Sequence, residues 1–247
     1  MRFFFHIAYC GTNYHGWQRQ PDVPTVQETI ETTLTELLKT AITAVGCGRT
    51  DAGVHASQYF FHIDSKDEID TDPFQLNKLL PDDISVYDII PVDDNNHAQQ
   101  DAVERVYEYL LHTQKDPFIS EQSALYLDEQ IDLDKMREAS YILLNYTDYR
   151  AFCVTPDRQD STIVNINYAE WKSSEQGDHL HFTISADRFL RGMVRVIVGQ
   201  LLEVGMGRLS VEQFEEHLSS KTAPKLLNQA WPQGLYLAQV RYPFFEE

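Results

Sequence analysis

The order in which strand-like and helix-like segments follow one another is the feature that most limits the fold of this chain. In each half the order is strand, helix, strand, strand, helix, strand. The expected segments are 2–9, 25–39, 42–45, 58–63, 72–80 and 85–90, and then 105–112, 133–144, 162–171, 179–185, 188–204 and 235–241. This β-α-β-β-α-β order is that of a split ferredoxin-like unit. The sequence therefore predicts an α+β fold of two such units, residues 1–100 and 101–247, with adjoining, mainly antiparallel sheets and a central cleft.

The segment 188–204 combines a broad apolar face with a row of arginines. At helical spacing, Arg188, Arg191 and Arg195 fall on the side opposite the apolar residues. Two glycines lie close to this row, and each costs about 1 kcal/mol relative to alanine inside a helix. They are Gly192 and Gly199. The row is either a solvated face or, as the glycines indicate, a face against which another segment packs.

The motif Gly-Arg-Thr-Asp-Ala-Gly-Val-His-Ala, residues 48–56, places one carboxylate between two predicted strands. Asp51 follows Arg49 by two residues and precedes Gly53 by two. Glycines permit backbone angles that other residues resist and let a ligand approach the main chain closely. Asp51 is therefore a candidate reactive group on a rigid turn, although an ordinary turn aspartate that bonds its own backbone would also fit.

The charge of the chain is strongly negative but unevenly placed. The sequence has 20 Lys and Arg against 38 Asp and Glu, a formal net charge of −18. This charge argues against broad, nonspecific affinity for nucleic acid, because phosphate binding depends largely on basic side chains. Since electrostatic fields fade over about 8 Å at physiological salt, a local basic site on an acidic body remains possible.

Cysteine usage and hydropathy predict a reduced compartment and no membrane anchor. The cysteines Cys10, Cys47 and Cys153 are odd in number and far apart, which fits neither a disulfide framework nor a metal knuckle. No apolar run approaches the ~18 residues that span a bilayer, and the start of the chain does not resemble a signal peptide. We find no nucleotide-binding or zinc motif. The sequence therefore predicts a cytoplasmic protein without a metal ion or a cofactor.

Two further segments combine aromatic and basic residues. Residues 8–20 mix tyrosines, a tryptophan, glycines and Arg19 in a loop, a composition that suits looped or single-stranded RNA. In residues 105–109, Arg105, Tyr107 and Tyr109 share one face of the predicted strand. Ordinary packing in a protein core explains either segment equally well.

Taken together, these segments resemble the TruA family of tRNA pseudouridine synthases. The matching pieces are YHGWQRQ (14–20), VQE (26–28), GRTDAGVHA (48–56), LPDDI (80–84), HA (97–98), RVYEY (105–109), MVR (193–195) and GLYL (234–237). They occur in the family's order and extend over essentially the whole chain.

The resemblance implies both a reaction and its residues. A uridine in the tRNA anticodon stem-loop, at positions 38 to 40, would be converted to pseudouridine without a cofactor by a homodimer. Asp51 matches the catalytic aspartate nucleophile, and Arg195 matches the basic residue that pairs with it. Tyr107 matches the tyrosine that stacks on the target base, and Arg49 matches the arginine that replaces the extruded nucleotide. Arg19 and Leu235 lie in the matching segments and are expected to contact the substrate.

The chain departs from the family pattern at peripheral positions. Cys10, Gln99, Cys153, Ser161 and Gly192 stand where the family commonly has charged or polar residues. A catalytically silent RNA-binding protein and an acidic module for basic protein partners are the alternative functions. A glycosidase is disfavoured, because no second carboxylate is clearly paired with Asp51.

Overall fold

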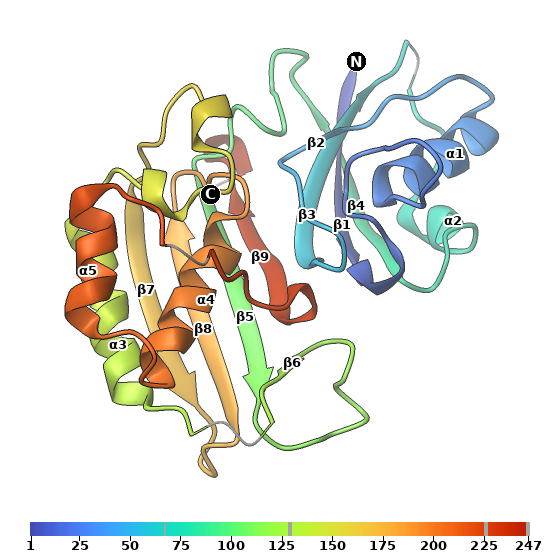
Figure 1. The fold of residues 1–247 in the computed structure, drawn as a ribbon. Coiled ribbons are helices and arrows are strands. Elements are labelled where there is room, and N and C mark those ends of the chain that lie inside the picture. The colour runs from blue at the N-terminus through green and yellow to red at the C-terminus, as the bar shows by residue number, and fades with distance from the viewer. Residues whose placement is uncertain (67, 128–129, 225–226, 246–247) are drawn as a thin grey trace. The chain divides into compact units, whose positions relative to one another are not determined.

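The computed structural model describes residues 1–66, 68–127, 130–224 and 227–245. The chain forms two compact units, the first made of Met1–Val103 with Tyr236–Glu247 and the second of Glu104–Leu235 (Figure 1). The expected second half extended to residue 247, whereas in the structure the last residues lie with the first unit. The predicted α+β class with mainly antiparallel strands is confirmed.

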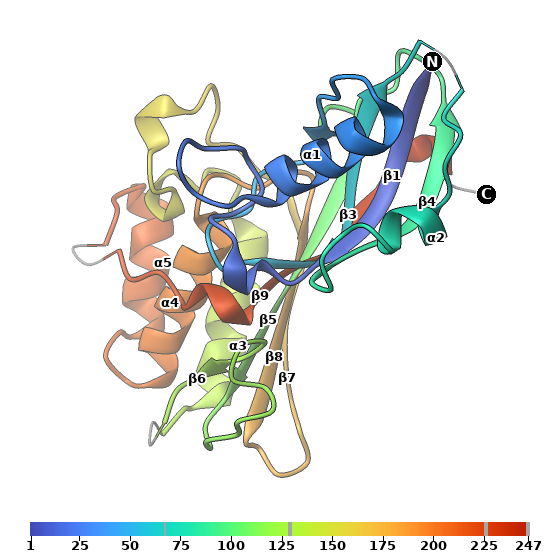
Figure 2. The ribbon, with the colours of Figure 1, turned by 90° about the vertical axis from the view of Figure 1, so that its right-hand side faces the viewer.

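The first unit is a sheet covered on one face by two helices (Figure 2). Its elements are β1 (Arg2–Tyr9), α1 (Val26–Leu38), β2 (Val45–Gly46), β3 (His55–Asp64), α2 (Pro73–Asn77), β4 (Ile84–Val92) and, from the end of the chain, β9 (Leu235–Arg241). Strand β1 lies antiparallel between β3 and β4, and β2 is antiparallel to β3. Strand β9 joins β3 in parallel through His55 and Ala56.

Both faces of this sheet are apolar. On one face, Phe5 and Phe61 meet Ile30 and Leu34 of α1 and Leu76 of α2. On the opposite face, the aromatic residues that follow β9 cover β1 and β3. The ring pairs are Phe4–Tyr242, Phe60–Tyr242, Phe4–Phe245 and Phe60–Phe245, with centroids 5.3–5.8 Å apart. Tyr242 and Phe245 therefore complete the core of the first unit.

Helix α1 is capped at both ends. The Thr25 hydroxyl accepts from the Glu28 backbone N–H at 3.4 Å, which satisfies one free donor of the first turn. Lys39 ends the helix in the left-handed conformation, with φ 55°. The buried residues Val26, Ile30 and Leu34 recur at helical spacing and fix which face meets the sheet.

The second unit is a sheet with three helices that pack on one another, and α3 also packs on β7. Its elements are β5 (Glu104–His112), β6 (Ala124–Leu125), α3 (Leu133–Ile142), β7 (Ile166–Ser173), β8 (His179–Ala186), α4 (Met193–Gly205) and α5 (Val211–Ser220). Strand β8 lies antiparallel between β5 and β7, and β6 is parallel to β5. Short 3-10 turns of this unit lie at Leu143–Asn145, Arg150–Phe152, Pro156–Arg158 and Pro232–Gly234. Those of the first unit lie at Gly11–Asn13 and Pro243–Phe245.

The predicted helix 188–204 is wrong at its beginning. Helix α4 starts at Met193, because Gly192 adopts the left-handed conformation with φ 68° and ends the preceding loop. Arg188 and Arg191 therefore lie outside the helix and form no row with Arg195 on a helix face. The packing that the glycines indicated is nevertheless observed at Gly199, because another segment of the chain lies against it.

Other boundaries also differ from the prediction. The expected strand 42–45 shrinks to β2, while the expected strand 58–63 lengthens to β3 and takes in the end of the 48–56 motif. The expected strand 162–171 begins four residues later, as β7. Helix α5 was not predicted, although Ser210 and Gln213 form a complete capping box at its start. Within the described residues, no helix is both long and apolar enough to cross a membrane.

His62 should make the stability of the first unit sensitive to acid. Its side chain is 2% exposed, and its Nδ1 accepts from the Ala98 N–H at 3.2 Å. Burial, assisted by the charges of Arg2 and His97, lowers the pKa of His62 to about 4. The unfolded chain, with a pKa of about 6.5, binds a proton first. The contribution of neutral His62 is therefore complete above pH 6.5 and is lost as the pH falls toward 4.

We expect this loss to reach about 2 kcal/mol at pH 5. Urea unfolding at pH 7 and pH 5 should show the wild type losing that much more stability than His62→Gln. Glutamine can accept the same hydrogen bond and does not titrate. An equal loss in both proteins would contradict the prediction.

Candidate active site

The loop between β2 and β3 carries Asp51 and is held by the hydroxyls of two core tyrosines. The Tyr9 hydroxyl lies 2.9 Å from the hydroxyl of Thr50, which is itself buried. Tyr59 donates to the Gly48 carbonyl at 2.6 Å. Both tyrosines are at most 4% exposed and belong to strands of the first sheet. The residues just before Asp51 are thus fixed to the core, while Asp51 itself is half-buried.

The segment 11–17 braces the same loop through main-chain contacts. The Trp17 N–H donates to the Thr50 carbonyl at 3.4 Å, and the Gly53 N–H donates to the Tyr14 carbonyl at 3.2 Å. Within the loop, the Val54 N–H donates to the Asp51 carbonyl at 3.2 Å. Sequence analysis found the two segments as separate motifs but missed their contact. The structure brings them together in the first unit.

Gly16 is the closest point of this brace, and its substitution should be costly. Its φ is +85°, and a Cβ added there would lie 2.2 Å from the Thr50 carbonyl oxygen. We expect Gly16→Ala to lower the free energy of unfolding by about 2 kcal/mol or more, since backbone strain and overlap add. Denaturant unfolding measures the loss.

Gly48 provides the matched control for that substitution. It belongs to the same loop, but a Cβ added there would meet nothing within 4 Å and its φ is not positive. Gly48→Ala should change the free energy of unfolding by no more than about 0.5 kcal/mol. Comparable losses of unfolding free energy in the two variants would contradict the close packing and backbone strain inferred at Gly16.

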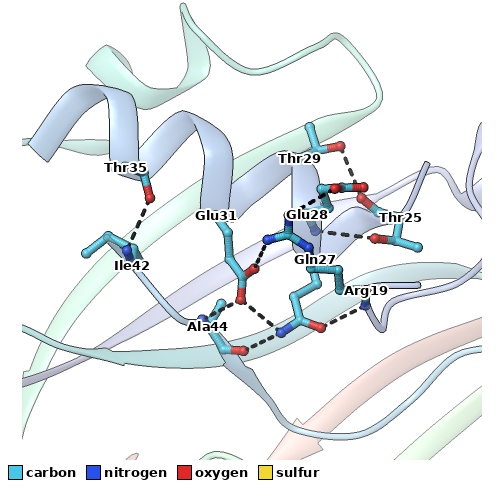
Figure 3. A network of polar contacts seen from close by, with 9 residues as sticks. All are labelled: Arg19, Thr25, Gln27, Glu28, Thr29, Glu31, Thr35, Ile42 and Ala44. Carbon is cyan, nitrogen blue, oxygen red and sulfur yellow. Dashed lines mark hydrogen bonds and ion pairs between the residues drawn. The ribbon is translucent and has the colours of Figure 1, made fainter. Parts of the chain in front are cut away.

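The two predicted arginines of the first unit have different surroundings. Arg49 is exposed in the loop beside Asp51. Arg19 forms ion pairs with Glu28 at 3.2 Å and with Glu31 at 3.3 Å, both on α1. Figure 3 shows that Gln27 joins this network, accepting from the Arg19 N–H and donating to Glu31. Arg19 is thus anchored to α1 by two carboxylates.

In the second unit, Tyr107 lies half-exposed on β5. Its ring meets Phe189 edge-on, with centroids 5.0 Å apart. Arg105, two residues earlier, donates to the Asp187 carbonyl at 3.1 Å. Strand β5 and the loop before α4 therefore hold this aromatic ring in place.

Arg195 lies on the first turn of α4 and is half-buried. Its Nε donates to the Ala230 carbonyl at 2.8 Å. Leu235, at the start of β9, is 5% exposed. Sequence analysis did not find Ala230, because the bond uses its main chain and leaves no trace in residue type.

The predicted site residues divide between the units. Arg19, Arg49 and Asp51 belong to the first unit, and Tyr107, Arg195 and Leu235 to the second. The pairing of Asp51 with Arg195 stays a prediction. In the part of the chain that the structure describes, no three His, Cys, Asp or Glu side chains are placed to hold a metal ion.

Comparison with known proteins gives a consistent family assignment. A family model described as tRNA pseudouridine synthase matches residues 144–243. The tRNA pseudouridine synthase A of Bacteroides thetaiotaomicron is 43% identical over 98% of this chain and 91% of the relative. That of Parabacteroides distasonis is 42% identical over 98% and 96%, and that of Bacillus subtilis is 35% identical over 98% and 99%. The chain therefore belongs to the tRNA pseudouridine synthase family and is an isomerase.

Proposed function

We propose that this protein converts uridine to pseudouridine at positions 38 to 40 of the tRNA anticodon stem-loop, with Asp51 as the nucleophile. The observation that carries the proposal is the 43% identity over almost the full chain to a tRNA pseudouridine synthase A. The braced loop supports it from the geometry, since a nucleophile must be held in a fixed position relative to its target.

The proposed reaction is an internal rearrangement. The bond between uracil N1 and ribose C1′ breaks, the base rotates, and a bond forms between C5 and C1′. C5 loses its proton and N1 gains one, so that substrate and product are isomers. Asp51 must be ionised to attack. We propose that Arg195 pairs with it, because an adjacent guanidinium favours and orients the carboxylate.

The remaining site residues handle the base. Extruding a nucleotide from a stem costs a few kcal/mol. Stacking of the extruded base on Tyr107 offsets about 1–3 kcal/mol of this cost. Arg49 occupies the place that the extruded nucleotide leaves in the stem. Arg19 and Leu235 complete the substrate contacts. For Arg19, an RNA phosphate would compete with the carboxylates of Glu28 and Glu31.

The finer architecture belongs to the same proposal. We propose that the two halves of the sequence, 1–100 and 101–247, are each a split β-α-β-β-α-β arrangement and that together they form the catalytic cleft. The amino-terminal part supplies the Asp51 loop, and the carboxy-terminal part supplies Tyr107 and Arg195. The protein acts as a homodimer without a cofactor. We place it in the cytoplasm, which agrees with its free cysteines.

Tritium release tests the activity directly. Unmodified tRNA labelled at uridine C5 should lose tritium to water when incubated with the protein, because C5 gives up its hydrogen. Transcripts with cytidine at positions 38, 39 and 40 should release none. Binding of tRNA without release from any transcript would favour the silent RNA-binding alternative. Capture of basic proteins without RNA would favour the interaction module.

A further inference from the structure

A short segment of the second unit runs along α4 and contacts it at successive turns. We call residues Asn228–Trp231 the strap. It lies between α5 and β9 in the sequence. Its hydrogen bonds to α4 and β5 lie within the second unit.

The first contact consists of two hydrogen bonds between Ala230 and Arg195, one to its side chain and one to its main chain. The Ala230 carbonyl accepts from Arg195 Nε at 2.8 Å, and the Ala230 N–H donates to the Arg195 carbonyl at 2.9 Å. Because Nε is part of the planar guanidinium, fixing it sets the plane of the group and the direction in which its two Nη atoms point.

The second contact requires a glycine one turn further along the helix. A Cβ at Gly199 would lie 2.2 Å from the Asn228 carbonyl oxygen and 3.3 Å from the Ala230 nitrogen. These are main-chain atoms, so the strap itself would have to move. One turn further still, Asn228 Nδ2 donates to Glu203 at 3.2 Å. Arg195, Gly199 and Glu203 are spaced by four residues and share one face of α4.

The third contact ties the strap to β5. The Tyr109 hydroxyl donates to the Trp231 carbonyl at 3.0 Å and lies 3.3 Å from the hydroxyl of Tyr126. Tyr109 is fully buried, and burial raises its pKa well above 10. Its hydroxyl therefore keeps its proton at neutral pH and acts as a donor to the strap.

We propose that the strap positions the Arg195 guanidinium for the isomerisation and that Gly199 and Tyr109 are positioning residues acting through it. This inference rests on the proposed function, in which Arg195 pairs with the catalytic aspartate. Gly199 lets the strap approach α4, Tyr109 fixes its far end, and Ala230 transmits both to Arg195 Nε. A displacement of about 1 Å at a reacting group can cost about 100-fold in rate.

A double-mutant cycle on turnover tests the proposal. Tritium release is measured for the wild type, Gly199→Ala, Arg195→Lys and the double variant. Lysine has no Nε–H group for Ala230 to accept. We expect Gly199→Ala to lower kcat by about 10- to 100-fold with KM for tRNA changed less than about twofold. In the Arg195→Lys background the same substitution should change kcat less than about twofold.

Gly177→Ala is the control for an added Cβ that meets no neighbour. A Cβ at Gly177 would have nothing within 4 Å, although its φ, unlike that of Gly199, is positive. It should leave kcat within about twofold of the wild type. Additive losses in the cycle, a loss confined to KM, or an equal loss in Gly177→Ala would overturn the proposal.

If the rate of Arg195→Lys is too small to measure, the cycle is run with Gly199→Ala and Tyr109→Phe. Because both act through one strap, the double variant should lie within about twofold of the slower single variant. If the kcat losses of the two single variants multiplied in the double variant, the proposed role of the strap would be wrong. A wild type that releases no tritium would instead sink the proposed function.

Discussion

Replacement of Asp51 by asparagine is expected to abolish pseudouridine formation, lowering kcat on the order of 10⁴-fold or more. Asparagine keeps the shape of the side chain but cannot act as a carboxylate nucleophile. The fold should survive, since the hydrogen bond that closes the loop uses the Asp51 carbonyl rather than its side chain. Tritium release in single-turnover experiments gives the rate, and denaturant unfolding verifies the fold.

Asp70→Asn removes the same charge from an exposed position of the first unit and should retain the wild-type rate. This control separates the loss of one negative charge from the loss of the nucleophile. If Asp51→Asn were as active as the wild type, Asp51 would have no part in the chemistry.

The second large effect is expected at Arg195. Arg195→Ala should lower kcat by about 10²- to 10³-fold, the range observed when one group that stabilises developing charge is removed. Its effect on KM for tRNA should be only a few-fold, because one contact among many to the RNA backbone is lost. Steady-state kinetics with a single tRNA species separates the two constants.

Arg158→Ala is a suitable comparison, because Arg158 is exposed in a 3-10 turn of the same unit. It removes an equal charge away from α4 and should leave kcat unchanged. An equal fall of kcat and tRNA affinity in Arg195→Ala would make Arg195 a binding residue and would contradict its proposed role beside the nucleophile.

The limits of sequence analysis are clear at the expected strand 42–45. The apolar run is typical of a strand, but its main-chain donors bond side chains of α1 instead of a neighbouring strand. The Ile42 N–H donates to Thr35, and the Ala44 N–H donates to Glu31 (Figure 3). Hydrophobic periodicity contains no information about such bonds. The sequence alone does not reveal that Glu31 accepts from the Ala44 N–H.

At α4 the apolar pattern extends through Phe189 and Leu190, which led the predicted helix to start too early. The helix begins only after Gly192, which has the left-handed conformation. Gly192 also packs closely on Val154, whose Cγ2 lies 2.5 Å from the place that a Cβ on Gly192 would occupy. Local sequence signals are informative where the chain bonds to itself nearby, as at the Thr25 cap. They failed where a distant residue decides the outcome.

The same division holds for the candidate site. Motifs singled out Asp51 and Tyr107 because their residue types suit the proposed chemistry. The brace of the Asp51 loop and the contact of Ala230 with Arg195 use main-chain atoms, which any residue can supply. Such support is visible only in the folded chain.

The position of β9 affects how the protein is made on the ribosome. The first unit is complete only when residues after the second unit have been synthesised, since the Tyr242 hydroxyl bonds the Ala98 carbonyl across 144 residues of sequence. At synthesis rates of about 5–20 residues per second, that separation corresponds to roughly 7–30 s. Throughout that interval the edge of β3 and the aromatic face of the first sheet lack their native cover. A nascent chain stalled before residue 235 would expose that surface to chaperones or to aggregation.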